Sequence, residues 1–156
     1  MDKHISEHIK IFRSWTAVNL RKAKDYKVLG CHWVFTYKSN SHGQIIKCKA
    51  RLVVRGDQQT ECDLPTRATT LALTLLQVIL AIIAKFDLET LQLDAVNAFV
   101  HADIDEVVYM KPPPGYAEPG KVLRLNKALY GLRRSPLLWQ EKITKAMKVL
   151  GLKELP

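Results

Sequence analysis

The chain has 156 residues, of which 47% are hydrophobic and 25% charged; it can bury one sizeable core, which excludes wholesale disorder. The formal net charge of +9 is concentrated early: residues 1–56 hold twelve Lys and Arg against three acids (12 − 3 = +9), and residues 57–156 hold twelve of each (12 − 12 = 0). This asymmetry favours a polyanionic partner, nucleic acid before membrane, with a solvated basic face as the alternative.

The cysteines and the N-terminus indicate an intracellular protein, cytoplasmic or nuclear. Cys31, Cys48 and Cys62 are odd in number and far apart, as expected for reduced thiols. His4 and His8 could share a helix face, but no second ligand pair follows, so we expect no zinc. The N-terminus is too polar for a signal peptide, and the apolar run 71–84 is too short for a membrane span, so we expect no membrane partner.

In chain order, the first predicted elements are a short helix over 6–15 and a β-hairpin. Aromatic and β-branched residues predict strands over 31–38 and 44–55, joined by turn residues 39–43. The second strand carries four cations at odd positions, which a regular strand places on one face: Lys47, Lys49, Arg51 and Arg55. Such a row suits a phosphate chain, or else protects an edge strand from aggregation.

A polar loop over 56–65 precedes a predicted buried helix over 71–86, which is rich in Leu, Ile and Ala. The stretch 91–100 follows, and its alternating Leu91 and Leu93 predict a half-buried strand ending at Asp94. A carboxylate at the end of a buried strand needs a partner. A divalent metal, a backbone N–H or a basic side chain could each satisfy Asp94.

The last third mixes short strands with one helix. We predict strands over 107–110 and 122–125, separated by a stiff Pro-rich spacer over 111–116, and a basic Gly-containing turn over 129–134. Ser135 and Pro136 predict a helix start as N-cap and N1, and Gly151 a C′ residue. We expect the acids Asp103, Asp105 and Glu106 to be solvated. Without a regular βαβ rhythm, the fold class is α+β.

Taken together, several segments resemble successive blocks of the copia-type retrotransposon reverse transcriptase. They read Gly-Cys-His-Trp-Val-Phe at 30–35, Lys-Ala-Arg-Leu-Val-Val-Arg-Gly at 49–56, Gln-Leu-Asp-Ala-Val-Asn-Ala-Phe at 92–99, Val-Tyr-Met-Lys-Pro-Pro-Pro-Gly-Tyr at 108–116 and Leu-Asn-Lys-Ala-Leu-Tyr-Gly-Leu-Arg-Arg-Ser-Pro at 125–136. They occur in the family's order and spacing, from about residue 12 onward.

The resemblance implies a single right-hand polymerase domain over 1–156, fingers-like over about 1–69 and 102–134, and palm-like over about 70–101 and 135–156. It implies RNA-directed DNA synthesis by nucleotidyl transfer at two Mg²⁺ or Mn²⁺ ions. Implied partners are an RNA template with a DNA primer, a deoxynucleoside triphosphate, and the rest of a retrotransposon polyprotein.

The resemblance also assigns roles to individual residues. Asp94 corresponds to the first metal-binding aspartate of the palm, and Phe99 to the aromatic that excludes a 2′-hydroxyl. The triphosphate contact falls among Lys49, Arg51 and Arg55, without a choice between them. The remaining assignments are the nucleotide-pocket residues Tyr130 and Gly131 and the nucleic-acid-binding residues Lys47, Arg133 and Arg134.

The sequence departs from the family pattern in two places. No adjacent Asp-Asp pair occurs, and the chain ends at Pro156 before the expected tyrosine–x–aspartate–aspartate hairpin. Gly-Asp-Gln-Gln at 56–59 replaces the usual Gly-Phe-x-Gln, which puts local packing in doubt. We therefore expect an incomplete palm, inactive alone and marginally stable or prone to aggregate. A non-catalytic nucleic-acid-binding module and a degenerate transposon remnant stay open as alternatives.

Overall fold

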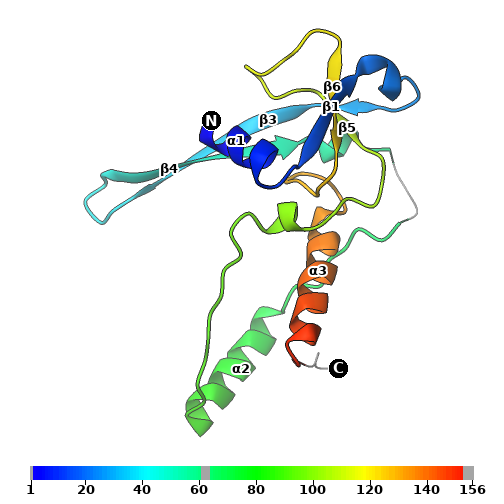
Figure 1. Cartoon of the computed structure of the whole chain (residues 1–156). Coiled ribbons are helices and arrows are strands. Elements are labelled where there is room, and N and C mark those ends of the chain that lie inside the picture. The colour runs from blue at the N-terminus through cyan, green and yellow to red at the C-terminus, as the bar shows by residue number, and fades with distance from the viewer. Residues whose placement is uncertain (1, 61–63, 153–156) are drawn as a thin grey trace.

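The computed structural model describes residues 2–60 and 64–152, in which short strands alternate with helices (Figure 1). The elements are α1 (Asp2–Lys10), β1 (Trp15–Asn19), the 3₁₀ helix η1 (Leu20–Ala23), β2 (Val28–Leu29), β3 (Cys31–Ser39), β4 (Ile45–Val54), η2 (Gly56–Gln58), α2 (Leu73–Phe86), η3 (Ala98–His101), β5 (Tyr109–Met110), β6 (Lys121–Leu125) and α3 (Ser135–Val149). This mixture confirms the predicted α+β class.

Four short strands form a mixed sheet in the order β1-β6-β5-β2. β1 runs antiparallel to β6, with Trp15 opposite Leu125, and β2 runs parallel to β5. Partners in this sheet lie far apart in sequence, because β1 and β2 precede the hairpin whereas β5 and β6 follow α2. The sheet therefore joins the first thirty residues of the chain to the segment that follows η3.

The predicted β-hairpin is confirmed as β3 and β4, which pair antiparallel from Cys31 opposite Val54 to Lys38 opposite Lys47. Its turn is closed by Asn40, whose Oδ1 accepts hydrogen bonds from the backbone N–H groups of His42 (3.0 Å) and Gln44 (2.9 Å). The hairpin extends away from the four-stranded sheet (Figure 1).

The main core lies where the base of the hairpin meets the sheet. It combines residues from β2, β4, β5, β6 and the segments around η3 and the 129–132 turn, including Leu29, Leu52, Val54, Val100, Met110, Leu125 and Leu129. Met110 is fully buried and Leu129 is 1% exposed. The core thus fixes the base of the hairpin against two later segments that carry predicted site residues.

Helix α3 agrees with its predicted end but starts slightly differently. Gly151, with φ +84°, donates its N–H to Lys148 O, and Leu152 donates to Met147 O, which is a Schellman C-cap. At the start, Arg134 is the N-cap and Ser135 already lies in the helix. Ser135 is not the N-cap because its hydroxyl donates to Leu129 O (2.6 Å).

Two predictions near the N-terminus were wrong. The helix expected over 6–15 lies over Asp2–Lys10, because Arg13 takes a positive φ of +49° that ends any helical continuation. Trp15 instead begins β1, a strand that we did not predict and that pairs with β6. His8 is 4% exposed, and its Nδ1 lies 2.7 Å from Ser14 Oγ; the side chain of His4 lies outside the described residues.

The helix predicted over 71–86 forms as α2, but it is not buried. Leu73, Leu80 and Phe86 are 70%, 53% and 62% exposed, and α2 stands away from the sheet (Figure 1). The strand predicted to end at Asp94 is absent: residues 87–95 are irregular, with Leu91 83% exposed. Within the described ranges this segment has no neighbouring strand, so its backbone cannot form a ladder.

Candidate functional site

A cavity of about 630 Å³ lies between β4 and the segment that leads into η3. Its lining includes five residues that the sequence assigned to the site: Lys47, Lys49, Arg51, Asp94 and Tyr130. Glu7, Ala50, Ala95, Val96 and Asn97 complete the lining. The structure thus brings the expected acid and three of the expected cations to one hollow, although they come from segments more than forty residues apart.

Strand periodicity places the three cations on the same side. Lys47, Lys49 and Arg51 occupy alternate positions of β4, while Leu52 and Val54 of the same strand are 2% and 1% exposed in the core. Lys47 is exposed, whereas Lys49 and Arg51 are half-buried. The Cζ of Arg51 lies 5.9 Å from the centroid of the Tyr130 ring, a cation–π contact.

The segment carrying Asp94 is held at its far end only. Asn97 adopts a left-handed backbone conformation (φ +52°), and Val100, three residues on, is 2% exposed in the core. His101 Nε2 lies 3.1 Å from Val96 O, which fixes the same bend. Asp94 itself is exposed, so water can solvate its carboxylate without a strand-end partner.

Phe99 and Tyr130 form an aromatic pair beside the cavity. Their ring centroids are 4.6 Å apart and the rings are tilted by 59°. Tyr130 lines the cavity, whereas Phe99 packs against the cluster of Ala102, Ala128 and Leu138. Phe99 therefore reaches the cavity through Tyr130 rather than by lining it.

Gly131 serves close backbone packing rather than lining the cavity. Its φ is +92°, and an added Cβ would lie 2.0 Å from Val54 O. Gly56 faces it, because a Cβ there would lie 2.0 Å from Gly131 O. Val54 N–H donates to Tyr130 O (2.8 Å), so this contact fixes the Tyr130 ring relative to β4.

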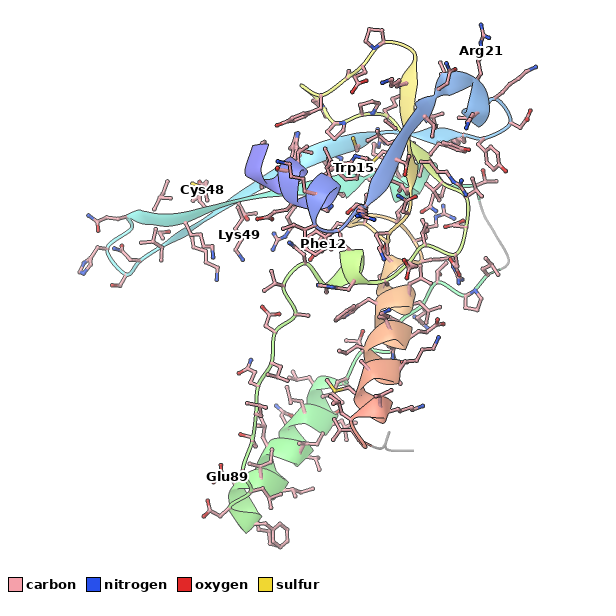
Figure 2. All side chains as sticks on the ribbon, in the orientation of Figure 1. Phe12, Trp15, Arg21, Cys48, Lys49 and Glu89 are labelled. Carbon is pink, nitrogen blue, oxygen red and sulfur yellow. The ribbon has the colours of Figure 1, made fainter. Side chains whose placement is uncertain are left out.

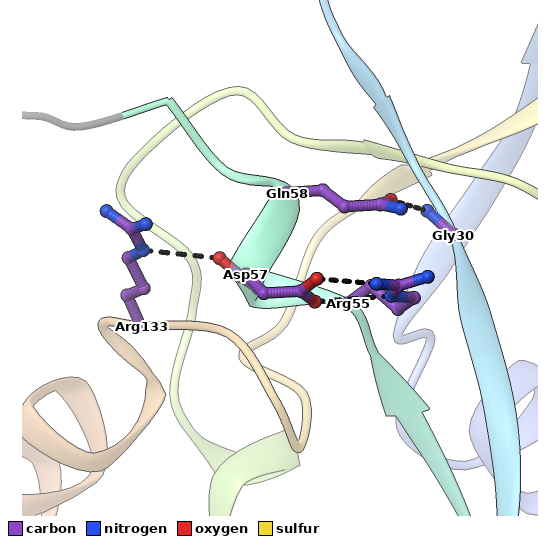
Figure 3. A network of polar contacts seen from close by, with 6 residues as sticks. Gly30, Arg55, Asp57, Gln58 and Arg133 are labelled. Carbon is purple, nitrogen blue, oxygen red and sulfur yellow. Dashed lines mark hydrogen bonds and ion pairs between the residues drawn. The ribbon is translucent and has the colours of Figure 1, made fainter.

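Arg55 and Arg133 belong to a polar network around η2 (Figure 3). Arg55 follows the end of β4 and forms an exposed 2.7 Å ion pair with Asp57, so it leaves the row of cations predicted for one face. The hydrogen bond from Arg55, reinforced by its charge, lowers the pKa of Asp57. Arg133 donates from Nε to Gly56 O (3.2 Å) and from its backbone N–H to Gln59 Oε1 (2.9 Å).

The polar residues at 57–59 tie this region together, although the sequence put its packing in doubt. Gln58 Oε1 accepts from the Gly30 N–H (2.8 Å), and Gln59 Nε2 donates to Glu106 Oε1 (3.0 Å). The sequence carried no signal for either contact, because each joins positions at least 28 residues apart.

Arg134 is buried rather than presented to a ligand. It is 6% exposed, forms a bidentate ion pair with Asp105 and donates to Pro65 O. The acids predicted to be solvated are therefore paired: besides Asp105, Asp103 accepts from Lys127 at 2.5 Å and Glu106 from Gln59. The basic turn over 129–134 holds the start of α3, and the proposals below do not use Arg134.

The acids of the cavity do not fit a two-metal site by themselves. Glu7 and Asp94 are its two carboxylates, and they share the lining with three cations. Across residues 2–60 and 64–152, no group of three or more His, Cys, Asp or Glu side chains is arranged to hold a metal ion. Two divalent ions need more carboxylate ligands than this.

Two further predictions concern the thiols and the membrane. Cys31 and Cys48 are free, and Cys62 lies outside the described residues. Burial raises the pKa of the Cys31 thiol to about 11, and its Sγ contacts Lys111 O at 3.4 Å. In the part of the chain that the structure describes, no helix combines the length and apolar character needed to cross a bilayer.

Comparison with known proteins identifies relatives over most of the chain. Residues 12–156 match the family described as reverse transcriptase (RNA-dependent DNA polymerase). The chain is 38% identical over 140 residues to the retrovirus-related Pol polyprotein from transposon TNT 1-94 of Nicotiana tabacum, covering 86% of this chain and 10% of that protein. It is 34% identical over 129 residues to each of the corresponding polyproteins from transposons RE2 and RE1 of Arabidopsis thaliana, covering 80% of this chain and 9% of each.

No solved structure matches the chain. The chain spans about a tenth of the length of the curated relatives it matches. The match over 145 of the 156 residues (156 − 12 + 1 = 145) nevertheless covers the hairpin, the cavity and α3. The chain therefore belongs to the reverse transcriptase (RNA-dependent DNA polymerase) family, as found in the Pol polyproteins of copia-type retrotransposons.

Proposed function

We propose that the chain is the fingers and first palm portion of an RNA-directed DNA polymerase, acting inside the cell with the rest of a Pol polyprotein. In this proposal, residues 1–69 and 102–134 are fingers-like, and residues 70–101 and 135–156 are palm-like. The supporting observation is the cavity that joins Lys47, Lys49 and Arg51 of β4 to Asp94. We propose that this cavity receives the triphosphate of an incoming deoxynucleotide.

Charge and burial support this assignment. Lys49 and Arg51 are half-buried, so a phosphate between them is less screened by water than on an open surface. Arg51 is also held against Tyr130, which limits the side-chain order lost on binding. We assign the triphosphate contact to Lys49 and Arg51 in preference to Arg55, which is paired with Asp57.

We assign the remaining residues by their places around the cavity. Asp94 would supply one carboxylate to the divalent metal that the reverse transcriptase family generally uses. Tyr130, supported by Phe99, would border the sugar and base. Because two carboxylates do not suffice for two metal ions, we propose that further acids come from another segment of the polyprotein. The chain alone should then bind nucleotide without extending a primer.

A binding assay tests the nucleotide site. Fluorescence anisotropy of a labelled deoxynucleoside triphosphate should show saturable binding that Lys49→Gln/Arg51→Gln abolishes. The control Lys142→Gln/Lys145→Gln removes the same charge from exposed positions of α3 and should leave binding unchanged. Equal binding by the Lys49/Arg51 variant and the control would refute the assignment.

Primer extension on an RNA template with Mg²⁺ or Mn²⁺ tests the catalytic part. We expect no extension by the chain alone. Extension that Asp94→Asn abolishes would confirm a polymerase and overturn only the expectation that the chain is inactive. Extension that persists in Asp94→Asn would contradict the role of Asp94.

A further inference from the structure

A second basic surface surrounds η1, away from the cavity. We call Arg21, Lys22, Lys24 and Lys27 the η1 patch; all four are exposed. Between residues 13 and 27 the chain has five Lys and Arg but a single acid, Asp25. Figure 2 places Arg21 at the opposite end of the molecule from Cys48 and Lys49 on the hairpin, so the patch is separate from the β4 cations.

The charges of the η1 patch are not neutralised within the described part of the chain. The ion pairs found there use other cations, namely Arg55, Lys121, Lys127 and Arg134. Glu118, near the patch through Gly120, is already paired with Lys121. A mobile counterion or an anionic ligand must therefore compensate the patch.

The patch is fixed to the sheet. Ala23 is 3% exposed and packs with Tyr109 and Val122. Leu20 N–H donates to Gly120 O, and Arg21 N–H donates to Asn19 Oδ1, both at 2.9 Å. The backbone that carries the cations is thus ordered before any ligand arrives, which lowers the entropy cost of binding.

The patch also borders a hollow. A cavity of about 720 Å³ is lined by Arg21 and Lys24 together with Asn19, Leu20, Ala23 and Gly120. Two cations beside small and apolar groups suit a ligand that joins phosphates to a less polar body, as each nucleotide of a strand does. A lipid surface is less well matched, because η1 has only four residues and provides no long amphipathic face.

We propose that the η1 patch binds the sugar–phosphate backbone of a nucleic-acid strand, separately from the nucleotide cavity. Phosphates lie against Arg21, Lys22 and Lys24, and the hollow receives a sugar or base. This inference rests on the proposed function, which supplies the nucleic acid. Recognition through phosphates makes the contact independent of base sequence and sensitive to salt.

The test compares two variants of equal charge in the full chain. Arg21→Gln/Lys22→Gln/Lys24→Gln alters the patch, and Lys85→Gln/Lys142→Gln/Lys145→Gln alters exposed positions of α2 and α3. Anisotropy of a labelled 20-nucleotide RNA is measured across a salt series. For three lost phosphate contacts, the slope of log affinity against log salt should fall by roughly 2 in the patch variant only. A charge-preserving Lys22→Arg/Lys24→Arg variant should bind like the unaltered chain.

Equal losses in the two triple variants would overturn the proposal, since they would show a general charge effect. So would unchanged RNA binding by the patch variant, with or without lost binding to phosphatidylserine vesicles; lost vesicle binding would assign the patch to a membrane surface. The deoxynucleotide assay separates the two hypotheses, because the patch variant should retain nucleotide binding. If Lys49→Gln/Arg51→Gln retains it too, the cavity assignment fails while the RNA comparison still decides the patch.

Discussion

At the scale of single residues, Gly56 and Gly131 leave no room for a side chain where β4 meets the 129–134 turn. We expect Gly131→Ala to lower the free energy of unfolding by about 3 kcal/mol or more, because it adds both a backbone penalty at φ +92° and a 2.0 Å overlap with Val54 O. Chemical denaturation measures the loss.

Gly43→Ala is the matched control. Gly43 also has a positive φ (+77°), but nothing lies within 4 Å of an added Cβ. It should lose only about 1 kcal/mol. Equal losses at the two positions would show that backbone conformation alone, and not the close contact with β4, explains the effect.

The buried thiol of Cys31 gives the molecule a pH dependence. Because its pKa is raised to about 11 from an ordinary 9.0, the folded chain retains a proton that the unfolded chain loses as the pH rises above 9.0. Stability from this group is complete below pH 9 and falls between pH 9 and 11. Denaturation at pH 8 and pH 10.5 should show a larger loss in the unaltered chain than in Cys31→Ala. A loss of the same size in both would contradict this origin.

At the scale of elements, the Asp105–Arg134 pair ties the segment after η3 to the start of α3. Asp105→Ala leaves the Arg134 guanidinium, 8% exposed, without its carboxylate, so we expect a loss of about 3 kcal/mol in the free energy of unfolding. Asp57→Ala, which breaks the exposed pair with Arg55, should cause no measurable change in the same experiment. Comparable losses would mean that burial of Arg134 does not matter.

The elements that local pattern could predict are those whose signals lie within one segment. The hairpin has its turn residues Asn40 and Gly43, and α3 has Pro136 and Gly151 at its two ends. Strand β1 was missed because its evidence lies in its partner: Trp15 pairs with Leu125, 110 positions away (125 − 15 = 110). Period two in residues 91–93 was read as a strand, but a strand also needs a neighbour.

The candidate site was predictable to a similar degree. Lys47, Lys49, Arg51 and Asp94 meet as the resemblance implied, because strand period and motif order are both properties of the sequence. Whether a cation is free depends on its surroundings, however. The sequence could not show that Asp57 pairs with Arg55 or that Asp105 pairs with Arg134, nor that Glu7 lines the cavity.

At the scale of the whole molecule, apolar surface is concentrated on α2 and the segment after it. Leu73, Leu80 and Phe86 are more than half exposed, as are Leu91 and Leu93. A contiguous apolar surface favours association. We expect the chain to self-associate with increasing concentration in sedimentation experiments. Leu73→Gln/Leu80→Gln/Phe86→Gln should suppress this without lowering the midpoint of thermal unfolding. A monomeric chain that melts cooperatively would contradict the expectation.

The contact between Gly56 and Gly131 also has a consequence for the timing of synthesis. The two residues are 75 positions apart (131 − 56 = 75), so the end of β4 cannot dock until the ribosome has added the intervening segment. At roughly 5–20 residues per second, that takes about 4–15 s. During this interval the nascent hairpin lacks its permanent neighbour, and an early-acting chaperone would find it before Tyr130 does.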